Sequence, residues 1–356
     1  MNVFAIVGAV LITGWALNCG AQPADDDPRF ITALTDVVAG QACERLEGQF
    51  RGLESDDRNS KPVFTGTLWI KECRAGSVDG EPHKLTLSIS AEGWRWIYRK
   101  KEKLAAEFVV SDYGKFDVAV DVTGRLDAVY DPRAKVMALW FLPQGEPRVR
   151  FSHVSDIDVD EEGLWASVLG GVASVFMHSP EDLATETFQQ LGRKKLTQKL
   201  AEGFSVATDF CTGRTFTQLA KLSKEQLISS VEQKAIVPTR RVQIHPDGLV
   251  IVGPLSAKSE KLQVKINGTS ANQLRAQLIC QDSAERLARA FINNELLPDV
   301  QVLATNEGGS LLTVDAAPGN CPIALITRPS GQTERPFNFS YRVTEQRVME
   351  PLADCD

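Results

Sequence analysis

Acidic residues are the first group in this chain whose types and spacing could do chemistry. Residues 156–162 alternate Asp156, Asp158 and Asp160 with apolar residues, as at the start of a calcium-binding loop. An EF-hand loop needs glycine at its sixth position and glutamate at its twelfth, where this chain has Glu161 and Ser167. We therefore interpret the segment as a strand running into a helix N-terminus, where acids complement the helix dipole. We expect no metal and no cofactor.

A second segment, residues 94–101, interleaves aromatic and basic side chains. Trp94, Trp96 and Tyr98 are followed by Arg99, and two lysines complete the segment. This mixture is typical of a membrane interface with anionic headgroups. A strand that ends in a solvated turn gives the same pattern. We favour the strand and keep membrane-surface contact as the alternative.

The four histidines give no catalytic or metal motif. They occupy positions 83, 153, 178 and 245, and no two of them have the spacing of metal ligands or stand in a recognisable nucleophile motif. The sequence therefore predicts no catalytic residues, and we expect a binding protein rather than an enzyme.

Cysteine usage indicates an oxidising compartment. The chain has seven cysteines, and without Cys19 six remain. An even number in an exported protein predicts disulfides, with fifteen pairings open for six cysteines. We expect at least two disulfides among Cys43, Cys73, Cys211, Cys280, Cys321 and Cys355.

The N-terminus predicts export. Residues 1–24 carry no Lys, Arg, Asp or Glu, and residues 3–17 form an apolar run of signal-peptide length. Cleavage after Ala21 would leave a secreted or periplasmic protein. Asn18-Cys19 also resembles a degenerate lipobox, so a lipoprotein anchored through Cys19 is the alternative. A net charge of −7 argues against a nucleic-acid partner.

The elements that must position any site are mostly strands. Residues 30–47 have the apolar spacing of a helix. Alternating patterns then predict an antiparallel meander between residues 62 and 159. Residues 164–178 contain no charge and repeat apolar residues at helical spacing, so we expect a helix that is buried nearly all round. A boundary near residues 256–260 precedes about a hundred residues typical of a β-sandwich.

The order helix, long meander, long helix and closing strands resembles the tubular lipid-binding (TULIP) superfamily. The likeness rests on Lys84–Ser90, Gly114–Val120 and Gly163–Trp165, and spans residues 28–256. It implies an α+β fold in which a long curved antiparallel sheet wraps a long amphipathic helix, followed by a smaller β-sandwich-like domain at 257–356. The family's strand-to-helix disulfide has no counterpart, because no cysteine lies between Cys73 and Cys211.

The resemblance implies a lipid or other apolar molecule as partner, bound in a groove between sheet and helix. The ligand-binding residues that we predict are Leu164, Val168, Val172, Val175 and Phe176 from the helix, and Val118, Val120, Leu139 and Phe141 from the sheet. The alternative function is a non-catalytic envelope or surface interaction protein without a small ligand, in which the same side chains form a closed core.

Overall fold

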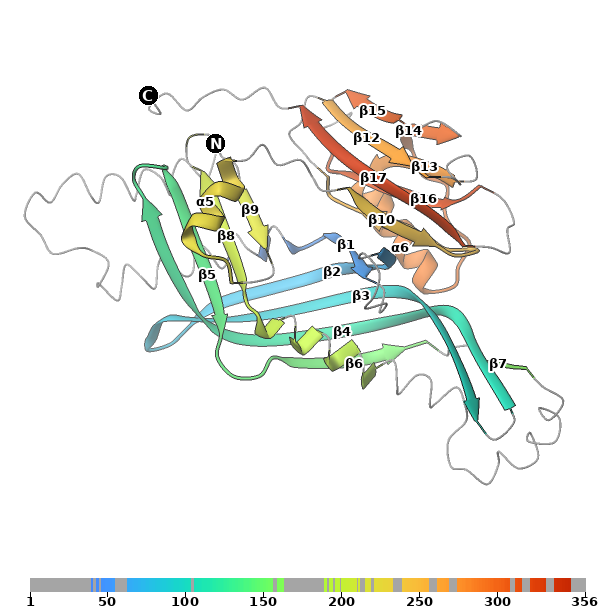
Figure 1. Ribbon diagram of the computed structural model, residues 1–356, viewed down its shortest axis with the longest axis horizontal. Coiled ribbons are helices and arrows are strands. Elements are labelled where there is room, and N and C mark those ends of the chain that lie inside the picture. Colours follow the sequence, from blue (N-terminus) through green and yellow to red (C-terminus); the bar gives the residue numbers. More distant parts are fainter. Residues whose placement is uncertain are drawn as a thin grey trace, which may run out of the picture.

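The structure is a computed structural model that describes most of residues 40–346 (Figure 1). The internal segments outside the description are residues 41–42, 45, 55–62, 104–105, 156–158, 163–188, 191, 195, 199, 210, 212–214, 219–220, 233–238, 256–260, 269–273, 308–310, 316–320 and 331–335. The predicted signal peptide at residues 1–21 and the predicted helix at 164–178 therefore lie outside the described residues.

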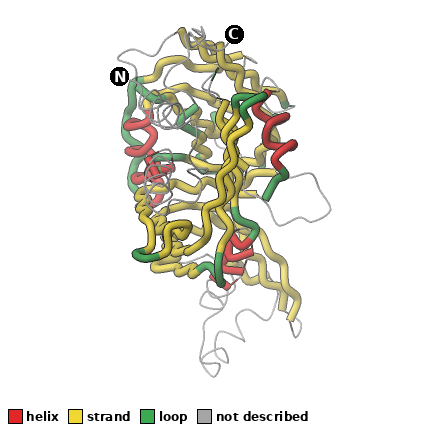
Figure 2. Tube along the Cα trace, turned by 90° about the vertical axis from the view of Figure 1, so that its left-hand side faces the viewer, coloured by secondary structure: helices red, strands yellow, loops and turns green. Residues whose placement is uncertain are grey.

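Strands dominate the described chain, and the helices are short segments at its periphery (Figure 2). The first strands are β1 (Phe50–Glu54), β2 (Val63–Val78), β3 (Glu81–Lys103), β4 (Ala106–Asp131), β5 (Val136–Pro143), β6 (Arg148–Val154), β7 (Val159–Glu162), β8 (Phe204–Asp209) and β9 (Thr215–Gln218). After helix α5 (Lys224–Glu232) come β10 (Arg240–Ile244), β11 (Val250–Val252), β12 (Lys261–Asn267) and β13 (Leu274–Cys280). Helix α6 (Gln281–Ile292) precedes β14 (Val302–Glu307), β15 (Leu311–Asp315), β16 (Ile323–Pro329) and β17 (Phe337–Gln346).

The strands form two sheets. The 13-stranded sheet has the order β15-β12-β17-β10-β2-β3-β4-β5-β8-β9, and β1, β6 and β7 pair beside this path. The second sheet has the order β11-β16-β13-β14. Nearly all pairs are antiparallel, but β10 joins β2 in parallel through Arg241↔Val63 and Val242↔Phe64.

Apolar and polar residues alternate over residues 85–91 of β3 and 116–122 of β4, as expected for strands. β3 has 23 residues and β4 has 26, so each runs for about 75 Å or more at about 3.3 Å per residue. β4 bends near both of its ends (Figure 1). The β2–β3 turn is Asp79-Gly80, with Gly80 at φ +77, the left-handed conformation that glycine adopts without strain. At the β4–β5 turn, Asp131 Oδ1 accepts hydrogen bonds from the backbone N–H groups of Arg133 and Ala134, both 3.0 Å.

The C-terminal strands enclose a core of their own. β10, β12, β15 and β17 of the large sheet face the small sheet, and one apolar cluster fills the space between them. Val242, Ile244 and Val264 are at most 1% exposed in this cluster. β10 and β11 lie before residue 256, but they pair with strands that come after it, β10 with β17 and β11 with β16. The proposed division at residues 256–257 stays a prediction.

The expected α+β class is wrong. The described chain is mostly strand, and its large sheet is mixed because β10 joins it in parallel. Within the described ranges there is no long amphipathic helix: α5 has 9 residues and α6 has 12. The physical reason is that short helical turns, around residues 43–46 and within residues 189–201, cover the middle of the sheet's apolar face.

The expectation of at least two disulfides is confirmed. Cys43 is bonded to Cys73, and Cys280 is bonded to Cys321. These bonds fit an extracellular or periplasmic location, where thiols are oxidised. The first joins the helical turn around residues 43–46 to β2, so a helix-to-strand disulfide exists, but it lies at the start of the sheet.

Candidate functional site

The register of the large sheet separates an apolar face from a polar face. Directly paired residues lie on the same side of a sheet. In β3 and β4 the pairs Leu87↔Val122, Ile89↔Val120 and Ala91↔Val118 place apolar side chains on one side. The intervening pairs, such as Ser88↔Asp121, place polar side chains on the other. We call these two sides the apolar face and the polar face.

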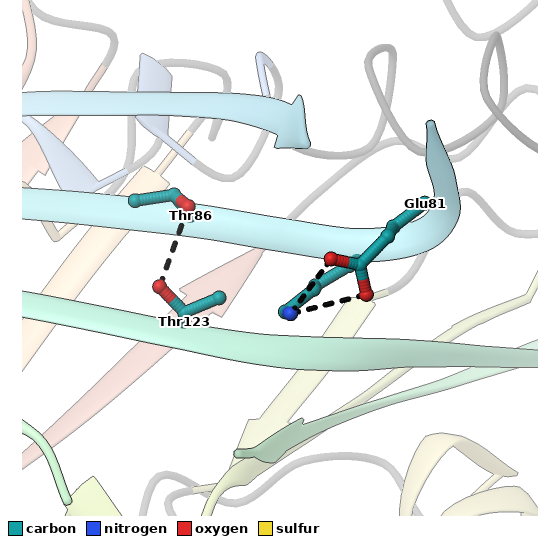
Figure 3. Close-up of polar contacts among 4 residues, drawn as sticks. Glu81, Thr86 and Thr123 are labelled. Atoms are coloured by element: carbon teal, nitrogen blue, oxygen red, sulfur yellow. Dashed lines mark hydrogen bonds and ion pairs between the residues drawn. The ribbon is translucent and has the colours of Figure 1, made fainter. Parts of the chain in front are cut away.

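The polar face is held by side-chain contacts between strands. Ser88 Oγ donates to Asp121 Oδ1 at 2.8 Å, and Arg150 forms an ion pair with the same carboxylate at 2.6 Å. Thr86 and Thr123 approach to 3.4 Å across β3 and β4, with Glu81 further along β3 (Figure 3). Polar contacts of this kind, exposed or half-buried, contribute little each. They mark the stretch of the polar face around Thr86 and Ser88 as partly solvated.

The middle of the apolar face is closely packed. One cluster contains Phe116, Val118, Val120 and Val149, and a neighbouring cluster contains residues such as Leu87 and Phe141. Ile89 contacts both clusters. The two clusters are therefore parts of one continuous apolar surface that crosses β2, β3, β4 and β6 and reaches β5.

Short segments cover this middle part. The helical turn around residues 43–46 is fixed by the Cys43–Cys73 disulfide, and Cys43 is itself only 6% exposed. Leu196 and Leu200, from the helical turns within residues 189–201, pack on the Val118 cluster. Gly192 allows a close approach, because a Cβ at that position would lie 2.9 Å from the ring of Phe151.

Beyond this cover, the apolar face continues onto β5 and β8 with its side chains half-exposed. Phe141 and Phe204 stack with their ring centroids 4.9 Å apart, at the edge of the buried part. The next pair on the same face is Leu139↔Val206, and both residues are half-buried. The opposite side of β5 is packed beneath α5, where Leu227 is 0% exposed. We call this half-exposed continuation the open end.

The open end reaches the tip of the β4–β5 hairpin. Ala128 pairs with Leu139, and Tyr130 pairs with Met137. Tyr130 is 40% exposed. Apolar surface therefore runs without interruption from a buried middle to an exposed tip.

The structure places the four predicted sheet residues on this one face. Val118 and Val120 are 3% and 6% exposed in one cluster, and Phe141 is 1% exposed in the other. Leu139 alone is half-exposed, at the open end. The five predicted helix residues lie outside the described residues: Leu164, Val168, Val172, Val175 and Phe176.

Sequence reasoning missed the residues that extend the face. Met137, Phe204 and Val206 were not predicted as site residues, although β8 shows the alternation of a strand. The missing information was the partner: β8 pairs with β5 across a long stretch of chain, and no local pattern fixes that register.

A second cluster, of aromatic residues, lies between the large sheet and the C-terminal strands. Trp94 is 0% exposed and its Nε1–H donates to the carbonyl oxygen of Leu249 at 2.5 Å. Trp96 stacks on His245 with ring centroids 4.0 Å apart, and its edge-on neighbour is Tyr113. The two tryptophans of the aromatic and basic segment thus pack inside the protein. Membrane contact by that segment stays a prediction.

A buried lysine completes this second cluster. Lys115 is 8% exposed, and its ammonium group lies 4.8 Å from the ring centroid of Phe291 in α6. It also donates to the side-chain oxygen of Asn294. Burial lowers the pKa of Lys115, and nearby Asp112 opposes that shift. The arrangement joins β4 to the end of α6 and contains no nucleophile placed against a base.

No cluster of three or more His, Cys, Asp or Glu side chains in the described part could hold a metal ion. No helix that the structure describes is long and apolar enough to cross a membrane.

Comparisons with known proteins add little. No protein-family model matches the chain, and no curated protein matches it in sequence. Among solved structures, it is similar to the SMP and C2 domains of extended-synaptotagmin 2, at 9% identity and a TM-score of 0.19, covering 89% of this chain and 65% of that one. It is also similar to lipopolysaccharide binding protein, at 13% identity and a TM-score of 0.15, covering 55% of this chain and 50% of that one. A third similar structure is a Bombyx mori beta-fructofuranosidase, at 8% identity and a TM-score of 0.13, covering 85% and 80%. Scores this low carry no argument about function.

Proposed function

We propose that this protein binds a lipid or another apolar molecule, without transforming it, on the apolar face of its large sheet. The observation that supports this is the open end: a buried apolar surface continues onto Leu139 and Val206, whose side chains are half-buried and not fully enclosed. A closed core would end at the Phe141–Phe204 ring pair, beyond which a sheet normally turns polar.

The energetics favour an acyl chain as the occupant. Each methylene removed from water contributes about 0.8 kcal/mol, so a chain lying along Leu139, Met137 and Val206 gains affinity from length alone. Ion pairs occupy both acidic groups at the hairpin. Lys224 pairs with Asp131 at 2.8 Å, and Arg125 pairs with Asp127 at 2.6 Å. The open end therefore offers apolar contact with no unpaired described carboxylate to desolvate.

Native mass spectrometry of the full chain tests the proposal first. We expect apolar molecules to co-purify, and a fluorescent fatty acid to bind saturably after they are removed. If nothing co-purifies and the fatty acid does not bind, the protein is better described as an interaction protein with no small ligand.

A pair of substitutions in β5 tests the place of binding. Leu139→Gln puts a polar group on the open end, and we expect it to weaken fatty-acid binding by about tenfold, since about two methylene contacts are lost. Leu142→Gln is the matched control, because Leu142 is also half-buried but packs on the α5 side of the strand. It should lower the melting temperature and leave binding unchanged. Equal effects of the two substitutions on binding would contradict this placement.

A further inference from the structure

The C-terminal strands of the large sheet have a packed inner face and an open outer face. β15, β12, β17 and β10 lie side by side in that order (Figure 1). Their inward side chains, such as Val264 and Phe339, belong to the cluster that faces the small sheet. The alternate residues point the other way, because side chains alternate along a strand. We call this second side the outer face, and every described residue on it is exposed or half-buried.

Three cations lie together on the outer face. The register pairs Lys265 of β12 directly with Arg342 of β17. Arg241 of β10 pairs with Ser340, two residues before Arg342, so Arg241 and Arg342 are diagonal neighbours. β12 and β10 flank β17 and are therefore two strand spacings apart, or about 10 Å. We call Arg241, Lys265 and Arg342 the basic patch.

The charges of the basic patch are not balanced by the described part of the chain. Its three side chains have no ion pair and no hydrogen bond with any described residue. The other described residues of the outer face are uncharged: Gln243, Gln263, Asn267, Leu311, Thr313, Asn338, Ser340 and Thr344. Like charges directly opposite each other destabilise strand pairing. The Lys265–Arg342 pair therefore costs stability, and an anion from outside the chain would offset that cost.

The surroundings of the patch indicate what kind of anion fits. Leu311 of β15 pairs with Lys265 and is 54% exposed. An aliphatic side chain beside basic ones suits the boundary between headgroups and acyl chains of a membrane. A sheet face is also broad, so all three cations can reach one extended surface. Single-stranded nucleic acids, by contrast, stack their bases on aromatic side chains, and the described outer face has none.

The geometry points to the basic patch as a docking site for the surface of a bilayer that contains anionic phospholipid. The three cations contact lipid phosphate groups, and Leu311 enters the headgroup layer beside them. The chain has a net charge of −7, but charges more than about one Debye length away, ~8–10 Å, are largely screened. The patch therefore determines the attraction at contact. This inference is independent of the proposed lipid binding, which uses the open end.

Co-sedimentation of the full chain with vesicles tests the docking site. We expect binding to vesicles of phosphatidylcholine mixed with phosphatidylserine, and far weaker binding to pure phosphatidylcholine. Salt at ~1 M should release the protein, because the Debye length falls to about 3 Å. Lys265→Gln/Arg342→Gln should weaken binding to the mixed vesicles by about 25-fold, since each basic side chain near an anionic surface contributes about fivefold. Binding of the fluorescent fatty acid should be unchanged in this variant.

Two matched variants separate the patch from general effects of charge and folding. Arg193→Gln/Lys194→Gln removes the same charges at two exposed residues outside the C-terminal strands, and it should bind the mixed vesicles as the wild type does. Lys265→Arg/Arg342→Lys keeps the charges of the patch and should keep the binding. The melting temperature of Lys265→Gln/Arg342→Gln should not fall, because the substitution removes a repulsion between paired residues.

Three results would overturn the inference. The first is a wild type that does not bind the mixed vesicles. The second is an equal loss of vesicle binding in Lys265→Gln/Arg342→Gln and in Arg193→Gln/Lys194→Gln. The third is a wild type that binds a single-stranded oligonucleotide in preference to the mixed vesicles, with that binding abolished by Lys265→Gln/Arg342→Gln, since the patch would then serve a nucleic acid.

Discussion

At the scale of single residues, His245 is buried in a way that couples stability to pH. Its ring stacks on Trp96, and its backbone N–H donates to the Tyr113 hydroxyl at 3.2 Å. The ring Nε2 has no hydrogen-bond partner among the described residues. A charged imidazole in this place would lose its hydration without gaining a partner. Burial therefore lowers the pKa of His245 to about 4.

We predict that acid destabilises the fold through this histidine. The unfolded state binds the proton with a pKa near 6.5, and the folded state binds it only near 4. The folded state is therefore favoured most above pH 6.5, and the free energy of unfolding falls as the pH drops from about 6.5 to about 4. Urea unfolding across this range should show the slope, and His245→Gln should reduce it.

The exposed His83 provides the control for this prediction. His83→Gln makes the same change at an exposed position, so it shows what the loss of a histidine does away from the Trp96 stack. If His245→Gln and wild type have parallel pH profiles between about 6.5 and 4, other groups account for the acid sensitivity and the role given to His245 is wrong.

The alternation of apolar and polar residues along the chain predicted the positions of some of these side chains. Alternation along residues 116–122 was enough to put Val118 and Val120 together on an apolar side, because the period of a strand is two. Whether Leu139 is covered, and what His245 touches, depends on segments far away in the sequence. The alternation around Trp94 and Trp96 likewise predicted a strand, but not that the C-terminal strands lie over it.

At the scale of elements, the disulfide Cys43–Cys73 fixes a covering segment to the apolar face. It encloses a loop with a sequence separation of 30 residues. We predict that Cys43→Ala/Cys73→Ala lowers the free energy of unfolding by about 3–4 kcal/mol. It should also raise the binding of a hydrophobic dye, since the turn around residues 43–46 is no longer held over Leu85 and Leu87. Chemical denaturation and dye fluorescence measure the two effects.

The second disulfide is a matched comparison. Cys280–Cys321 has a sequence separation of 41 residues and joins the end of β13 to the chain just before β16. Cys280→Ala/Cys321→Ala should cost a similar free energy, because loop-closure entropy varies slowly with loop length. It should not raise dye binding at native conditions. Similar dye binding by both double variants would show that the N-terminal turn is not a specific cover.

The sequence predicts strands where the two-residue alternation of apolar and polar residues persists. It does not predict which strands pair when they lie far apart in the chain. The meander between residues 62 and 159 follows from alternation of apolar and polar residues. The mixed character of the large sheet does not, because β10 and β2 meet in parallel through only two residue pairs. The α+β prediction failed for a related reason: an apolar face shows that a cover is needed, but not that one long helix provides it.

At the scale of the whole molecule, two cores connect the parts of the chain. The cluster around Val242 and Ile244 binds β10 and β11 to the strands that follow residue 260. The cluster around Trp94 binds β3 and α6, through Leu287, to the same C-terminal strands. β10 also extends the large sheet by pairing with β2 on one side and β17 on the other. Contacts of this kind make the two halves stabilise each other.

We therefore predict that the point at which the chain is cut decides whether its C-terminal part folds. A fragment of residues 239–346 keeps β10 to β17, including Val242, Ile244 and Val250, so both sheets of the C-terminal core are complete. It should be soluble and unfold cooperatively. A fragment of residues 257–346 lacks β10 and β11, which leaves β17 and β16 each with an unpaired edge and exposes apolar residues such as Leu325. It should aggregate or remain unfolded, as thermal unfolding and light scattering would show. If the shorter fragment is equally soluble and cooperative, residues 257–346 are an independent domain, and β10 and β11 belong to the part of the chain before them.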